Sequence, residues 1–197
     1  VETLYDSCDG RKLNGPNDLV FDNTGGFWFT DLGKHNDMGT TYGGLYYAKA
    51  DGSSITCAVR GPNMNGVGLS PDGKTLYAAE TYTCRLMKFN ITSPGKVAPD
   101  AGPGGPGIPV YRPAGYKFFD SLGIEASGNI CVATIGECGI SVISPDGDLV
   151  EFVATDDIFT TNIAWGGDDM MDAYICLSGS GRLVKTRWAR PGLKLQY

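Results

Sequence analysis

Short apolar stretches alternate with turns rich in glycine and aspartate along most of the chain, and several of these stretches are preceded by a polar residue. The pattern is clearest from Leu13 to Asp31, LNGPNDLVFDNTGGFWFTD, where a Gly-Pro turn leads to Asn17 and Asp18 and a Gly-Gly turn joins two apolar runs. Short apolar runs separated by turn residues are typical of β-hairpins. This stretch therefore predicts a hairpin whose first strand begins with polar side chains at the end of a sheet.

The same unit returns three more times, with lead residues Asn65, Asp120 and Asn162 at intervals of roughly 40 to 55 residues. Several short strands repeated at this period are typical of a β-propeller, in which each blade is about four antiparallel strands around a central channel. Because the innermost strands line that channel, we expect the four lead residues Asn17, Asn65, Asp120 and Asn162 to converge on one axial pocket. The alternative is that asparagine and aspartate lead these strands only because they suit turns.

The repeat and the composition together predict an all-β fold in a single domain, residues 1–197. The chain has 29 glycines and 11 prolines, and amphipathic helical periodicity is hard to find. A Gly- and Pro-rich stretch, Thr92 to Gly115, is interpreted as an insertion within the propeller because the strand pattern resumes after it. About four blades are visible, so the chain is either a small four-bladed ring or part of a larger ring that lacks blades before Val1. The second interpretation is favoured.

The net charge and the lengths of the apolar runs limit the kinds of partner that the protein is expected to bind. The formal net charge is −6 and lysines and arginines are never more than two in a row, which argues against nucleic acid as a partner. No apolar run approaches the roughly 18 residues of a membrane span, so no membrane partner is expected. The six cysteines lack CxxC spacing and are expected to be reduced. A cytoplasmic location is favoured, with secretion or a periplasmic location left open.

Four phrases occur in a recognisable order: NGPNDLVFD with GGFWFTD, then NGVGLSPDGKTLYAAET, then FDSLGIEASGNICVA, then RWARPGLKL. In this order they resemble the senescence-marker-protein, gluconolactonase and luciferin-regenerating-enzyme family. The resemblance implies a six-bladed β-propeller, of which about four blades, the C-terminal two thirds, are present. It also implies a missing N-terminal segment of the same protein and a catalytic divalent cation, usually Ca²⁺, on the axis.

The resemblance further implies roles for individual residues. Asn65 and Asp120 match metal ligands, and Asn17 matches an asparagine that contacts the substrate or the coordination sphere of the metal. A glutamate ligand is expected from the missing blades. Gly15 stands where some sugar-lactonase members carry an arginine, which argues against an aldonolactone recognised in that way.

The chemistry of these side chains favours the same assignment. Amide and carboxylate oxygens suit Ca²⁺, whereas zinc sites usually use histidine and cysteine, which do not cluster here. Another divalent cation such as Zn²⁺, Mg²⁺ or Mn²⁺ remains open as the cofactor. The predicted function is a metal-dependent hydrolase that opens a small-molecule lactone or ester, with Asp120 as the catalytic base, as a ligand, or as both. The alternatives are an organophosphate-type esterase on the same site and a non-catalytic ligand-binding propeller scaffold.

Other polar residues are weaker candidates. Ser121 follows Asp120 and is either a contact near the metal or an ordinary turn residue. Asp31 ends its strand, where satisfying backbone amides is favoured over binding a second cation. Asp18 is expected to brace the adjacent turn, and His35, the only histidine, is expected to be a solvated loop residue.

Overall fold

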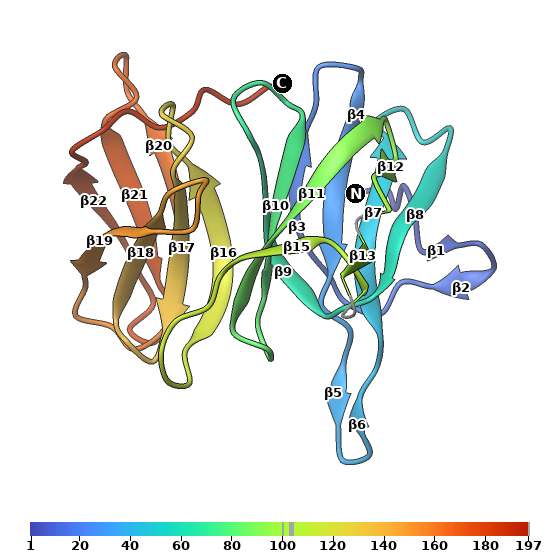
Figure 1. The fold of residues 1–197 in the computed structure, drawn as a ribbon, viewed down its shortest axis with the longest axis horizontal. Coiled ribbons are helices and arrows are strands. Elements are labelled where there is room, and N and C mark those ends of the chain that lie inside the picture. The colour runs from blue at the N-terminus through green and yellow to red at the C-terminus, as the bar shows by residue number, and fades with distance from the viewer. Residues whose placement is uncertain (100, 103–104, 197) are drawn as a thin grey trace.

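The structure is a computed structural model that describes residues 1–99, 101–102 and 105–196. Every regular element in these ranges is a β-strand, and no helix occurs in them, as the turn-rich pattern predicts. Four antiparallel sheets follow one another along the chain (Figure 1). The prediction of an all-β fold with about four propeller blades is therefore confirmed. Within the described ranges, no helix has the length and apolar character needed to cross a membrane.

Strands within each blade pair in sequence order, from the channel outward. The first blade contains β3 (Pro16–Phe21), β4 (Gly26–Asp31), β7 (Gly43–Lys49) and β8 (Ile55–Gly61). The second contains β9 (Met64–Leu69), β10 (Thr75–Glu80), β11 (Arg85–Ser93) and β12 (Lys96–Val97), with β15 (Ile108–Tyr111) also paired to β11. The third contains β16 (Phe118–Ile124), β17 (Ile130–Ile135), β18 (Gly139–Ile143) and β19 (Leu149–Ala154). The fourth contains β20 (Thr160–Gly166), β21 (Asp172–Leu177) and β22 (Arg182–Arg187).

Among the described residues, three two-stranded hairpins lie outside the blades. They are formed by β1 (Ser7–Cys8) with β2 (Arg11–Lys12), β5 (His35–Asn36) with β6 (Gly39–Thr40), and β13 (Ala101–Gly102) with β14 (Gly105–Pro106). The last of these falls in the stretch from Thr92 to Gly115, of which residues 100, 103 and 104 lie outside the described residues. Both β12 and β15 pair with β11, so the two ends of this stretch belong to the second blade. Its assignment as an insertion within a single domain stays a prediction.

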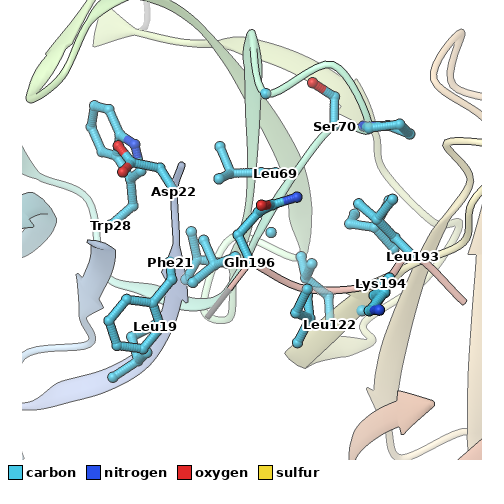
Figure 2. A pocket seen from close by; sticks show the side chains of 18 of the residues that line it. Leu19, Phe21, Asp22, Trp28, Leu69, Ser70, Leu122, Leu193, Lys194 and Gln196 are labelled. Atoms are coloured by element: carbon cyan, nitrogen blue, oxygen red, sulfur yellow. The ribbon is translucent and has the colours of Figure 1, made fainter. Parts of the chain in front are cut away.

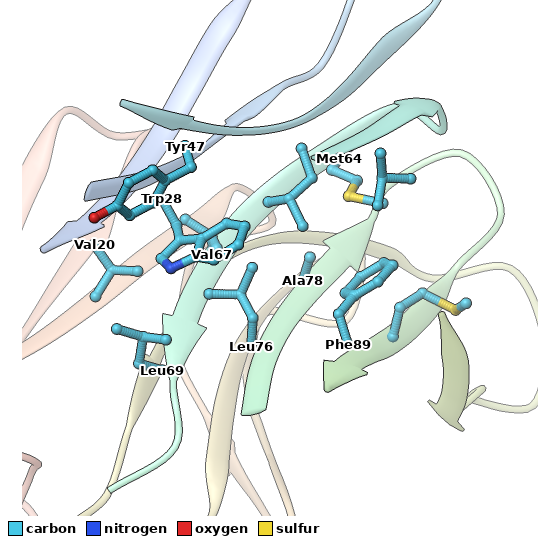
Figure 3. Packing of buried hydrophobic residues seen from close by; sticks show 12 residues of the cluster. Val20, Trp28, Tyr47, Met64, Val67, Leu69, Leu76, Ala78 and Phe89 are labelled. Atoms are coloured by element: carbon cyan, nitrogen blue, oxygen red, sulfur yellow. The ribbon is translucent and has the colours of Figure 1, made fainter. Parts of the chain in front are cut away.

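The hydrophobic core lies between neighbouring blades rather than inside any one sheet. Between the first and second blades, Trp28 is 1% exposed and packs with residues of β9, β10 and β11 (Figure 3). Similar clusters join the second blade to the third and the third to the fourth. Because a propeller strand contacts a neighbouring sheet on each face, β9 is buried at all six positions, the polar Asn65 included.

The inner strands β3, β9, β16 and β20 are neighbours in that order, since β9 contacts both β3 and β16 and β16 contacts β20. Each inner strand carries a register irregularity in its pairing with the second strand of its blade. In β3 the shift falls between Pro16 and Leu19, and in β16 it falls between Phe119 and Leu122. A bulge turns side chains away from simple alternation, and bulges are frequent beside active sites. In β3 and β16 the irregular positions include the polar lead residues that the sequence singled out.

The cysteines form no disulfide, and two tryptophans pack against each other. All six cysteines are free in the structure. Trp188 is 4% exposed and packs edge-on against Trp165, with the ring centroids 6.0 Å apart. These rings therefore belong to the packing between the third and fourth blades.

Candidate functional site

Inner strands of three successive blades bring Asp18, Asn65, Asp120 and Ser121 together. The backbone N–H of Val67, on β9, donates to Asp18 Oδ2 at 3.3 Å. Asp18 on β3 is also hydrogen-bonded by the side chain of Ser121, and the carboxamide of Asn65 is hydrogen-bonded to Asp120. Four oxygen-bearing side chains from distant parts of the sequence thus share one end of the channel.

Close backbone approach makes this convergence possible. Gly66 follows Asn65 on β9, and a Cβ atom at Gly66 would lie only 2.6 Å from the Cα atom of Ser121. Only glycine therefore lets β9 and β16 come this near. On the other side, the buried hydroxyl of Thr30 on β4 donates to the carbonyl oxygen of Asn65, which ties β9 to the first blade.

Asn65 is the most informative member of the group. It is 4% exposed, and its Nδ2 donates to Thr81 Oγ1 at 3.2 Å. Its Oδ1 is buried without a hydrogen-bond partner among the described residues. A buried polar atom without a partner costs about 1 to 3 kcal/mol. Such an atom is expected where a ligand completes the site.

Both carboxylates are held in surroundings that disfavour their charge. Burial, with a smaller contribution from the nearby charge of Asp18, raises the pKa of Asp120 to about 6, against the lowering effect of hydrogen bonding by Asn65 and the Ser121 backbone. Burial also raises the pKa of Asp18. Within the described ranges neither carboxylate forms an ion pair with a lysine, arginine or histidine.

These observations fit a hard divalent cation. Two carboxylates, an amide oxygen and a hydroxyl make an all-oxygen donor set, which is what Ca²⁺ prefers. A cluster of three or more histidine, cysteine, aspartate or glutamate side chains able to hold a metal does not occur in the part of the chain that the structure describes. The fit therefore depends on the unpartnered Asn65 Oδ1 and on the two carboxylates beside it.

Asn17 precedes Asp18 on β3, and no hydrogen bond between its side chain and the group is recorded among the described residues. Its side chain is exposed and lines a hollow that Asp18 also lines, together with Leu19, Phe27 and Phe29. A role for Asn17 in contacting substrate or metal stays a prediction.

The contacts of Asp18 differ from those expected from the sequence. The expectation that it braces only the adjacent turn is wrong, because its carboxylate reaches β9 and Ser121 as well as the N–H of Leu19. The register shift between Pro16 and Leu19 explains the error, since strict alternation along β3 does not decide which side chain faces the channel. Its position at the head of an inner strand was the signal that could have identified it.

The remaining candidates have local roles. Asp31 is 1% exposed, and its carboxylate accepts hydrogen bonds from the backbone N–H groups of Asn14 at 2.7 Å, Gly15 at 2.8 Å and Gly33 at 2.7 Å. The favoured interpretation of Asp31, satisfying backbone amides, is confirmed. His35 is exposed in the β5–β6 hairpin, where Nδ1 lies 2.9 Å from Thr40 Oγ1, as expected of a loop histidine.

Replacing Asp31 by asparagine should therefore affect stability without changing metal binding. An amide has one acceptor oxygen in place of two, so at least one backbone N–H loses its partner, and we expect the free energy of unfolding to fall by about 1 to 3 kcal/mol. Urea unfolding measures this. Asp37→Asn, at an exposed position in the following loop, is the control and should have no effect. An equal loss in both variants would contradict the interpretation.

A cavity of about 440 Å³ lies along the inner strands (Figure 2). Asp18 lines it, and the rest of its wall is mostly apolar, including Trp28, Leu69 and Leu122. The C-terminal segment contributes Leu193 to Gln196 to the same wall. A cavity of this size is in the range of small-molecule sites, and Asp18 connects it to the polar group described above.

Comparison with known proteins finds a matching family model and several similar proteins. The sequence model of the SMP-30/Gluconolactonase/LRE-like region matches residues 1–179. Lactonase drp35 of Staphylococcus saprophyticus is 36% identical over 131 residues, which are 66% of this chain and 39% of that protein. The solved structure of regucalcin from Agrobacterium tumefaciens, titled a calcium-binding protein, superposes with a TM-score of 0.72 at 20% identity, over 91% of this chain and 65% of that one. The gluconolactonase of Xanthomonas campestris has a TM-score of 0.70 at 22% identity, over 87% of this chain and 56% of its own. The chain thus spans about two fifths of the length of the curated lactonase that it matches.

Proposed function

The chain belongs to the SMP-30/Gluconolactonase/LRE-like family, and on that premise we propose that it is part of a Ca²⁺-dependent hydrolase that opens a lactone ring. The observation that carries the proposal is the buried Asn65 Oδ1, which has no hydrogen-bond partner within the described ranges, in a side chain that lies beside Asp120. The name of its sequence relatives, lactonase, supports the reaction class. The all-oxygen donor set supports Ca²⁺ over zinc.

Four side chains would hold the cation. They are the Asn65 amide oxygen, the carboxylates of Asp18 and Asp120 and the hydroxyl of Ser121. A glutamate from outside this chain is the further ligand that the family pattern leads us to expect. When bound, the cation polarises the lactone carbonyl and stabilises negative charge on its oxygen.

Residues of the chain itself transfer the proton, position the carboxylate and orient the substrate. Asp120 accepts a proton from the attacking water as the new bond to the carbonyl carbon forms, and this proton goes to the ring oxygen when its bond to that carbon breaks. The Asn65 amide donates to Asp120 and keeps the carboxylate in place. Asn17, exposed on the same strand as Asp18, orients the lactone.

The proposal is tested by measuring lactone ring opening with Ca²⁺ and after chelation. Hydrolysis should depend on added Ca²⁺. Repeating the assay with Mg²⁺, Mn²⁺ or Zn²⁺ in place of Ca²⁺ determines whether another cation supports the reaction. A phosphotriester assayed under the same conditions distinguishes an organophosphate esterase from a lactonase. Hydrolysis that is unchanged by chelation would rule out the metal.

Calcium should also stabilise the folded chain, whatever the substrate. A ligand that binds only the native state at about 100 times its Kd adds about 2.7 kcal/mol to the free energy of unfolding. Thermal unfolding with and without Ca²⁺ measures the effect. The same melting temperature in both, together with no heat in a calorimetric Ca²⁺ titration, would favour a propeller that acts only as a scaffold.

A further inference from the structure

Thr81 immediately follows β10 and contacts both the second and the third blades. We propose that Thr81 is a positioning residue that fixes the orientation of the Asn65 carboxamide, so that Oδ1 rather than Nδ2 faces the cation site. This inference rests on the proposed function, because it concerns how one of the proposed ligands is presented.

The Thr81 hydroxyl, like any hydroxyl, has a single hydrogen to donate. Thr81 Oγ1 donates it to the backbone carbonyl oxygen of Phe119 on β16, at 2.8 Å. Towards Asn65 the hydroxyl can therefore act only as an acceptor. It accepts from Asn65 Nδ2 at 3.2 Å.

The Asn65 amide has one favoured orientation beside this hydroxyl. If the carboxamide rotated by half a turn, Oδ1 would face Thr81 Oγ1, whose only hydrogen is already donated to the Phe119 carbonyl. Asp120 beside the amide also favours the NH₂ end, because an ionised carboxylate only accepts. Oδ1 is then the polar atom of this amide that has no hydrogen-bond partner among the described residues, and it is buried. An oxygen held in this way is the kind of ligand that a hard cation binds.

A purely structural role for Thr81 predicts a loss of stability without a loss of metal affinity. The bond to the Phe119 carbonyl joins the second blade to the third, so losing it would lower stability wherever the amide points. A positioning role predicts weaker metal binding as well. Partners that orient metal ligands typically contribute 10- to 100-fold to metal affinity, roughly the effect we expect here.

Three substitutions separate the two roles. Thr81→Val keeps the shape and removes the hydroxyl, and we expect the Kd for Ca²⁺, measured by calorimetry with CaCl₂ alone, to rise about 10-fold or more. Thr81→Ser keeps the hydroxyl and should bind Ca²⁺ nearly as the wild type does. Thr83→Val makes the same change two residues on, at a hydroxyl bonded to Glu80 rather than to Asn65, and should leave Ca²⁺ affinity unchanged.

A measurement without metal keeps this inference separate from the proposed function. In NMR spectra of the Ca²⁺-free wild-type chain, the side-chain NH₂ protons of Asn65 should show NOEs to the side chain of Thr81. In Thr81→Val these NOEs should weaken as the amide samples both orientations. Wild-type NH₂ protons that face away from Thr81 would overturn the inference whatever the variants do.

The calorimetric results also distinguish failure of the Thr81 inference from failure of the proposed function. Wild-type binding of Ca²⁺ with equal affinity in Thr81→Val would overturn the role of Thr81 and leave the metal site standing. Equal losses in Thr81→Ser and Thr81→Val would also overturn it. No Ca²⁺ binding by the wild type would instead remove the metal from the proposed function, and the NMR comparison would still decide whether Thr81 orients Asn65.

Discussion

Replacing Asp120 by asparagine is expected to lower kcat/KM for lactone hydrolysis by about 100-fold or more while the chain stays folded. Asparagine has nearly the same size, so it can keep the place of Asp120 on β16 beside Asn65. It cannot take a proton from water, and it offers a cation no negative charge. We therefore expect both turnover and Ca²⁺ affinity to fall. Lactone assays and calorimetry measure the two effects separately.

Stability is the control for this variant. Burial disfavours the charged form of Asp120, and the carboxylate has no cationic side-chain partner in the described ranges, so the fold does not depend on its charge. Urea unfolding should show Asp120→Asn to be as stable as the wild type in the absence of Ca²⁺. Asp148→Asn, at an exposed turn position, should change neither activity nor stability. Near-full hydrolysis by Asp120→Asn would remove this residue from the mechanism.

The fold could be predicted because its signals are local. Each blade is encoded by short apolar runs and by turns such as Ser70-Pro71-Asp72-Gly73, and these repeat along the chain. The site depends on strand geometry as well. Asn65 and Asp120 could be placed at the heads of inner strands, and the structure brings them into hydrogen-bonding contact. Their function as ligands stays a prediction.

Residues whose partners are distant could not be placed from the sequence. Asp18 was misplaced because a bulge in β3 decides its direction. Thr81 carries no motif, and its importance lies in two partners on other strands, the donor Asn65 Nδ2 and the acceptor carbonyl of Phe119. Glu125 is a third case, since its main partners are 63 and 65 residues further along the chain.

Glu125 connects the C-terminal segment to the third blade. Its side chain is 0% exposed, and it accepts hydrogen bonds from Trp188 Nε1 at 2.7 Å and from Arg190 Nε at 2.7 and 2.9 Å. Asn129 Nδ2 donates to the same carboxylate at 2.8 Å. A backbone bridge from Glu125 to Gly192 continues the contact. A buried carboxylate with this many donors cannot be removed without leaving the donors unsatisfied.

Glu125→Ala should therefore lower the free energy of unfolding by about 3 to 5 kcal/mol, because it leaves the Arg190 charge and the buried Trp188 N–H without their partner. Urea unfolding at neutral pH measures the loss. The control is Glu151→Gln, which removes the other carboxylate bonded to Arg190. That side chain is 43% exposed, so we expect a loss of less than about 1 kcal/mol.

The same contacts predict how stability depends on pH. Burial alone would raise the pKa of Glu125, but the hydrogen bonds from Arg190, Trp188 and Asn129 outweigh it and hold the pKa below its usual value. Stability from this group is then fully present above the unfolded-state pKa of about 4.3 and is lost as the pH falls through the lower folded-state value. Glu125→Gln, which cannot ionise, should lack this part of the acid-induced loss in urea unfolding between neutral pH and about pH 3. If its free energy of unfolding followed the wild-type curve over the whole range, Glu125 would not be a source of the acid sensitivity.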